Sequence, residues 1–114
     1  MKITVYYPKD SKDVSKGFRV VEYEVDIKDC LEVRTLDRFV DCVTELVIHK
    51  AAEDFCGQYG EYMDKCIEEY IYKQGEAMRP NVEIAVRMEI QRLAEIIQKC
   101  KKDKRCIAEA LRRK

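Results

Sequence analysis

Residues 21–55 read VEYEVDIKDCLEVRTLDRFVDCVTELVIHKAAEDF, and the spacing of their apolar side chains changes part of the way along. The beginning of the stretch alternates apolar and acidic residues, which is the pattern of a β-strand with one buried face. The apolar residues of this part are Val21, Tyr23, Val25 and Ile27, and the acidic ones are Glu22, Glu24 and Asp26. After Thr35 the apolar residues recur every three or four positions, which indicates an amphipathic helix. A strand region followed by helices predicts an α+β fold.

The helix predicted after this change of spacing has a clear beginning. Thr35 is a favoured N-cap residue, and Asp37 lies in the first turn, where the helix dipole favours a negative charge. The apolar stripe consists of Leu36, Phe39, Val40, Val43, Val47 and Ala51, and it is widened by Ile48, Ala52 and Phe55. We therefore expect a largely buried helix over about residues 36–55, followed by a break at Gly57 and Gly60.

Another strand is expected N-terminal to this stretch. Residues 3–7 are β-branched or aromatic and stop at Pro8, after which a polar connection leads to Gly17. Phe18 and Val20 are out of phase with Val21, which predicts a bulge or a twist at that point. Because two strands alone are marginally stable in water, they require helices against one face, a third strand near residues 31–33, or the strands of a second subunit.

More helices are expected in the C-terminal half of the chain. One covers about residues 61–74 with Gly75 as its terminator, and the next begins at Asn81, after Pro80. A short last helix covers about residues 106–112. A heptad seam is formed by Val86, Ile90, Leu93, Ile97 and Cys100.

These elements define the predicted architecture. Residues 1–114 form a single domain with a β-strand region over 1–33 and a helical region over 35–114. An N-terminal β-hairpin or small antiparallel sheet precedes a bundle of three to four helices. We also expect a homodimer, because a second copy would complete both the small sheet and the short heptad seam.

The composition points to a protein of a hot environment. Charged residues make up 39% of the chain, Asn occurs once, and yet there are six cysteines. Proteins of hyperthermophiles are rich in charge and poor in thermolabile residues, and their intracellular members use disulfides. We expect a protein of a hyperthermophilic archaeon or of its virus, located in the cytoplasm (the host cytoplasm if viral). No apolar run has the length of a membrane span, and the N-terminus lacks the pattern of a signal peptide.

The cysteines are spaced for disulfides rather than for metal. No two lie two to four residues apart, so neither a zinc knuckle nor a redox Cys-x-x-Cys motif is present. Two pairs would each cross a break in the helices, Cys56 with Cys66 and Cys100 with Cys106, and Cys30 with Cys42 then remains by elimination. Six cysteines allow fifteen connectivities. The alternative is that several of them are small buried hydrophobic residues.

Charge is unevenly distributed although the formal net charge is zero. Residues 53–76 hold seven acidic and two basic residues, and residues 99–114 hold eight basic and two acidic ones. A basic segment of this kind favours contact with phosphates. The candidate nucleic-acid-binding residues are Lys99, Lys101, Lys102, Lys104, Arg105, Arg112 and Arg113. The alternative is a solvated helix whose basic end complements the helix dipole.

No catalytic constellation is readable in the sequence. His49 is the single histidine and lacks a nucleophile motif, so a structural or surface role is expected. Glu22, Glu24 and Asp26 resemble metal-binding acids on a strand, but alternating acids are commoner on a solvated face. The four glycines form no phosphate-binding loop. We therefore expect no enzyme activity, no cofactor and no metal.

Two functions remain open on the sequence alone. The first is a small nucleic-acid-binding or regulatory protein that contacts DNA or RNA phosphates through its basic C-terminal segment. The second is a protein-interaction module that adapts or inhibits a host protein through exposed tyrosines and the acidic helix. No membrane partner is expected.

Overall fold

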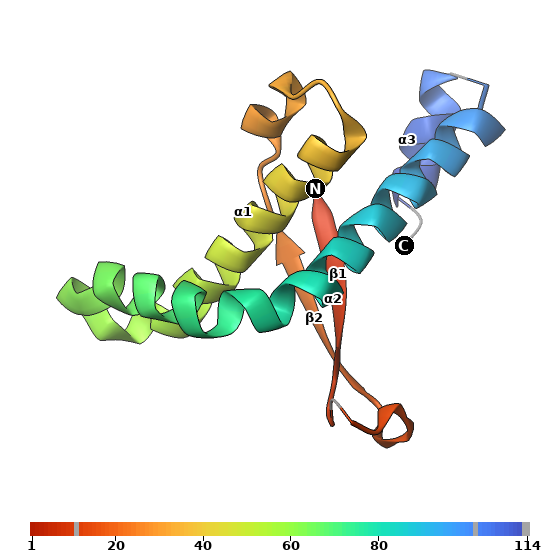
Figure 1. Ribbon diagram of the computed structural model, residues 1–114. Coiled ribbons are helices and arrows are strands. Elements are labelled where there is room, and N and C mark those ends of the chain that lie inside the picture. Colours follow the sequence, from red (N-terminus) through yellow and green to blue (C-terminus); the bar gives the residue numbers. More distant parts are fainter. Residues whose placement is uncertain (11, 102, 113–114) are drawn as a thin grey trace.

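A computed structural model describes residues 1–10, 12–101 and 103–112 of the chain. It has a two-stranded antiparallel sheet at the N-terminus and helices after it, so the α+β prediction is confirmed (Figure 1). The elements in chain order are β1 (Lys2–Pro8), η1 (Val14–Lys16), β2 (Phe18–Glu24), η2 (Lys28–Glu32), α1 (Leu36–Cys56), η3 (Gly57–Tyr62), α2 (Met63–Lys99) and α3 (Lys104–Arg112), where η marks a 3-10 helix.

The two strands pair without interruption. The register runs from Lys2 opposite Glu24 to Pro8 opposite Phe18, one residue against one. The bulge predicted near Val20 is therefore wrong. Phe18 and Val20 lie on the outer face of the hairpin and are about half exposed, at 47% and 53%. Phe18 and Val20 alternate with the core-facing residues of β2 because their side chains lie on the other face of a regular strand.

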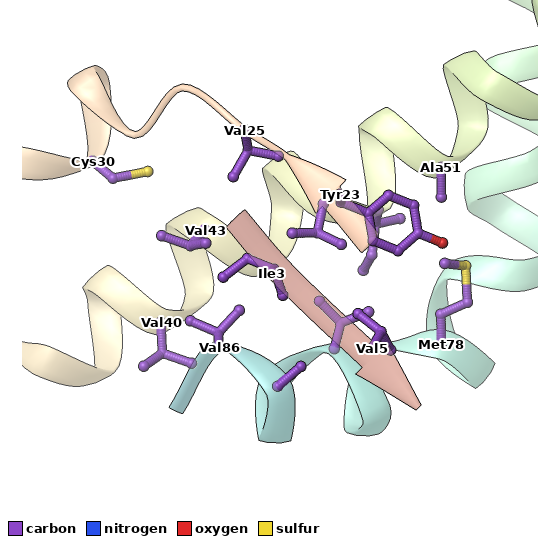
Figure 2. Packing of buried hydrophobic residues seen from close by; sticks show 14 residues of the cluster. Ile3, Val5, Tyr23, Val25, Cys30, Val40, Val43, Ala51, Met78 and Val86 are labelled. Carbon is purple, nitrogen blue, oxygen red and sulfur yellow. The ribbon is translucent and has the colours of Figure 1, made fainter. Parts of the chain in front are cut away.

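The inner face of the hairpin is covered by α1 and α2. Ile3 and Val5 of β1 and Tyr23 of β2 point into the same cluster as Val43 of α1 and Val86 of α2 (Figure 2). The helices thus supply the cover that a two-stranded sheet requires. The third strand considered near residues 31–33 is not formed, because residues 28–32 make the 3-10 helix η2.

Helix α1 follows the sequence pattern closely. The Oγ1 atom of Thr35 accepts a hydrogen bond from the backbone N–H of Arg38 at 3.2 Å, which confirms the predicted N-cap. The predicted apolar stripe is buried from Val40 to Ala52. Leu36 and Phe55, at the two ends of the stripe, are exposed.

The predicted bundle of three to four helices is wrong in its helix count. Only α1 and α2 are long, because α2 runs without a break through Gly75, Pro80 and Asn81. Gly75 is buried in the helix, and a Cβ atom built on it would lie 3.8 Å from the Cγ2 atom of Ile48, so this is where α1 and α2 approach closely. Packing against α1 therefore overrides the local terminator signals of glycine and proline.

Helix α2 changes direction in its middle, so that its two halves point different ways (Figure 1). Pro80 lies inside the helix and cannot donate a hydrogen bond to the preceding turn, which is the usual cause of such a bend. Ion pairs tie this part of α2 to α1. Arg79 pairs with Glu45, and Arg87 pairs with Asp37 at 3.0 Å.

The six cysteines form three disulfides with the predicted pairing. The Cα–Cα distances are 5.7 Å for Cys30–Cys42, 5.8 Å for Cys56–Cys66 and 5.5 Å for Cys100–Cys106. Each bridge joins two elements that are adjacent in the sequence: η2 to α1, the end of α1 to the start of α2, and the end of α2 to α3. Closing such short loops stabilises the segments that each bridge joins against unfolding, by about 2–3 kcal/mol in the chain-entropy model.

Candidate functional site

The basic C-terminal segment forms a tight turn between α2 and α3. The backbone N–H of Cys100 donates to the carbonyl of Ile96 at 2.9 Å and closes α2, and Lys101 then takes a positive φ of 51°. The Asp103 carboxylate accepts hydrogen bonds from the backbone N–H groups of Arg105 (2.9 Å) and Cys106 (3.4 Å), which caps α3. The chain therefore reverses within a few residues.

The Cys100–Cys106 disulfide holds this reversal in place. In a straight helix the two residues would be about 9 Å apart along the axis, whereas here their Cα atoms are 5.5 Å apart. Helix α3 consequently lies back against the last turns of α2 (Figure 1). We call the exposed cations of this turn the basic knuckle, which consists of Lys99, Lys101, Lys104 and Arg105.

The charges of the basic knuckle are not compensated by ion pairs within the described chain. None of its four cations takes part in an ion pair with another described residue. Lys104 and Arg105 occupy the first turn of α3, where the positive end of the helix dipole disfavours cations. Asp103 is the nearest acid in the sequence, and its carboxylate is engaged as the helix cap. A phosphate placed here would meet several unpaired donors at once.

Three of the predicted nucleic-acid-binding residues are not part of the basic knuckle. Lys102 and Arg113 are not among the described residues, and Arg112 is described only by its position in α3. The structure brings together the remaining four, Lys99, Lys101, Lys104 and Arg105, at one end of the molecule.

The other polar candidates are engaged with neighbours on the surface. Glu22 pairs with Lys2 at 3.2 Å, and Glu24 pairs with the N-terminal amine at 3.3 Å. The Nδ1 atom of His49 lies 2.8 Å from a carboxylate oxygen of Glu53 on the next turn of α1. Among residues 1–10, 12–101 and 103–112, no three His, Cys, Asp or Glu side chains are grouped to hold a metal ion.

A second site was missed by sequence reasoning. The chain turns at η3, residues 57–62, between α1 and α2, and we call this connection the elbow. A groove of about 750 Å³ at the elbow is lined by aromatic and basic side chains. Phe55 and Tyr62 come from the two sides of the elbow, and Arg19 comes from β2. No local motif could have revealed this groove, because Arg19 is more than thirty residues away from the others in the sequence.

Tyr70 of the groove lining and two further tyrosines, Tyr7 and Tyr23 of the hairpin, have buried or partly buried phenol groups. The hydroxyl groups of Tyr7 and Tyr23 are 3.1 Å apart, and the hydroxyl of Tyr70 donates to the sulfur of Met78 at 3.4 Å. Burial, reinforced by the hydrogen bond to Tyr23, raises the pKa of Tyr7 far above its usual value. Burial also raises the pKa of Tyr70. The raised pKa keeps the Tyr7 and Tyr70 phenols neutral at physiological pH.

Comparison with protein-family models, with curated proteins and with solved structures finds no match to this chain. Within the described parts of the chain, no helix combines the length and the apolar character that crossing a membrane requires. What the protein binds must therefore be inferred from its own residues.

Proposed function

We propose that this is a small nucleic-acid-binding protein that contacts the phosphate backbone through the basic knuckle. The observation that carries the proposal is the clustering of Lys99, Lys101, Lys104 and Arg105, all exposed and without ion-pair partners among the described residues. A stabilising role alone would favour acids, not cations, in the first turn of α3.

The expected binding is electrostatic and independent of base sequence. Lysine and arginine that neutralise phosphates release counterions, so the affinity falls steeply as salt is added. The knuckle is a short turn rather than a long helix placed to read base edges in a groove. If three phosphates are neutralised, the affinity for duplex DNA decreases about 40-fold between 50 and 200 mM salt.

The test is fluorescence anisotropy of a labelled duplex DNA at these two salt concentrations. The triple variant K101Q/K104Q/R105Q should bind weakly, with a salt slope reduced by about one for each phosphate that it no longer neutralises. The matched control is K12Q/K28Q/R34Q, which removes the same charges from exposed positions elsewhere. Equal binding by the two triple variants, or no binding of duplex by the unmodified protein, would refute the proposal.

The alternative function, a protein-interaction module, is supported by a different observation. Tyr62 and Tyr72 are 66% and 86% exposed, and Ile84, Met88 and Ile97 on α2 are also exposed. Exposed aromatic and apolar side chains of this kind favour protein interfaces. On the same observation we propose that the protein forms a homodimer through the uncovered part of α2.

Sedimentation equilibrium tests the proposed dimer. The unmodified protein should sediment as a dimer, and I97D should shift it toward the monomer because a charge would be buried at the interface. Leu31→Asp, which adds the same charge at an exposed apolar residue of η2, serves as the control. A monomeric unmodified protein at all concentrations would refute the dimer.

A further inference from the structure

The groove at the elbow between α1 and α2 has the composition of a ligand site. Its volume of about 750 Å³ falls in the range of small-molecule and cofactor pockets. Phe55 and Tyr70 lie with their ring centroids 5.2 Å apart, and Tyr59 and Tyr62 add two further rings. Three of the rings, Phe55, Tyr59 and Tyr62, are 45–66% exposed. Aromatic faces are thus presented to solvent in a concavity, where they are available for stacking.

The charge of the groove is opposite to that of its surroundings. Residues 53–76 contain seven acids and only two bases, and both bases, Lys65 and Lys73, line the groove. Arg19 of β2 adds a third cation from the hairpin, 5.3 Å from the ring centre of Tyr7. None of these three cations forms an ion pair with a described residue. The lining contains these three cations and the acid Glu69, so the groove has an excess of positive charge.

A disulfide and a tight backbone connection constrain the elbow. The Cys56–Cys66 disulfide joins the end of α1 to the start of α2, and Cys66 is itself part of the lining. Gly60 in η3 has a positive φ of 55°, a conformation that suits glycine and permits the tight connection. A connection that is constrained before binding loses less backbone freedom when a ligand binds, which increases affinity.

The spacing of the cations indicates the size of the ligand. Lys65 and Lys73 are eight residues apart on α2, which corresponds to about 12 Å along the helix axis. A short chain of phosphates is long enough to run from one of these lysines to the other. Aromatic platforms beside a basic track are the usual design for binding single-stranded nucleic acid.

We propose that this groove binds a short single-stranded segment of nucleic acid, with bases stacked on Tyr59 and Tyr62 and phosphates beside Arg19, Lys65 and Lys73. The proposal rests on the proposed function only in taking nucleic acid as the class of ligand. The groove and the basic knuckle share no residue. The proposal deepens that function by adding a contact to unpaired bases, which a duplex does not offer. The two sites lie near opposite ends of α2, about 40 Å apart along the helix.

A 5′-phosphorylated tetrathymidylate with a 3′ fluorophore tests the groove, because it is too short to bridge the groove and the knuckle and because the knuckle contains no tyrosine whose fluorescence it could quench. Its binding is followed by anisotropy and by quenching of tyrosine fluorescence, which is readable because the chain has no tryptophan. Y59A/Y62A should weaken binding at least tenfold, and K65Q/K73Q should weaken it and flatten its salt dependence. The matched controls, Y72A for the rings and K12Q/K28Q for the charges, should leave binding unchanged. Thermal unfolding of each variant reports whether it is folded.

The outcomes separate this proposal from the proposed function. Loss of tetranucleotide binding in Y59A/Y62A with unchanged duplex binding supports the groove, whatever the duplex experiment shows for the knuckle. The groove proposal is overturned if the folded Y59A/Y62A variant binds the tetranucleotide as well as the unmodified protein does, or if nothing binds. It is also overturned if thymidine monophosphate competes equally well, or if only an acidic aromatic peptide such as (Glu-Phe)₃ quenches the tyrosines.

Discussion

The middle of α2 packs against both α1 and the hairpin, whereas the end of α2 extends beyond them and contacts α3. In the middle, Gly75, Met78, Val82, Ala85 and Val86 are buried. In the C-terminal arm, which comprises residues 87–101 and 103–112, the buried residue among the described side chains is Cys100. One part of the helix is therefore stabilised by a core, whereas the other is held to α3 by a disulfide and carries exposed charge. This difference suits the arm for binding rather than for holding the fold together.

The largest expected effect contrasts two isoleucines. Ile48 is 2% exposed in the core, and Ile97 in the arm is 46% exposed. Ile48→Ala should lower the free energy of unfolding by about 3 kcal/mol, because it removes buried methyl groups and leaves a cavity. Ile97→Ala should cost less than about 1 kcal/mol in the monomer. Urea unfolding of both variants checks this, and equal losses would contradict the division of α2 into two parts.

The disulfides sharpen the same contrast. C56S/C66S releases the elbow beside the core and should lower the free energy of global unfolding by about 2–3 kcal/mol. C100S/C106S should instead release α3 alone, since the arm contributes little to the core. Hydrogen exchange would then show fast exchange confined to the arm, with a nearly unchanged urea midpoint. A large drop in that midpoint for C100S/C106S would show that the arm is part of the cooperative unit.

Alkaline pH should destabilise the core through Tyr7. The pKa of Tyr7 is raised by burial and by its hydrogen bond to Tyr23, so above about pH 10 the unfolded chain loses a proton that the folded chain keeps. Stability is then fully present below pH 10 and falls by at most about 1.4 kcal/mol per pH unit above it. Urea unfolding between pH 8 and 11 measures this loss. In Tyr7→Phe the loss should be smaller, and an identical pH dependence in both proteins would contradict the assigned cause.

The smallest expected effect is a gain in stability within the core region. A Cβ atom on Gly75 would make ordinary contacts, 3.6 Å to a methyl group of Ile71 and 3.8 Å to one of Ile48. Gly75→Ala should therefore stabilise the protein by up to about 1 kcal/mol, because alanine has the higher helix propensity. Thermal unfolding reports the change. A destabilised variant would mean that α1 and α2 are too close for a methyl group.

Local patterns in the sequence predicted much of this fold. The strand phase at Val21, the cap at Thr35 and the cysteine pairs across each break are all set by residues close together in the chain. The predicted end of a helix at Gly75 was wrong because residues far away in the sequence decide the structure there. Contacts with α1, which is remote in the sequence, keep the helix intact through Gly75 and Pro80. Local signals give way where tertiary packing is extensive.

The two candidate sites also differ in whether the sequence alone could predict them. The basic knuckle was predictable because its cations are close together in the sequence and need only a turn to gather them. The aromatic groove was not, since it requires Arg19 of the hairpin to lie beside Tyr62 and Lys73. Tyrosines were expected at the surface, but only the folded chain shows that Tyr59, Tyr62 and Tyr70 share one concavity with Phe55.

The most direct test of the knuckle is an NMR titration of the ¹⁵N-labelled protein with duplex DNA at 50 mM salt. We predict that the largest amide shifts occur at Lys99, Lys101, Lys104 and Arg105 and that they disappear at 200 mM salt. The amides around Val43 and Val86 in the core should not move. Shifts centred elsewhere on the molecule, or no shifts at 50 mM salt, would contradict phosphate binding by the C-terminal arm.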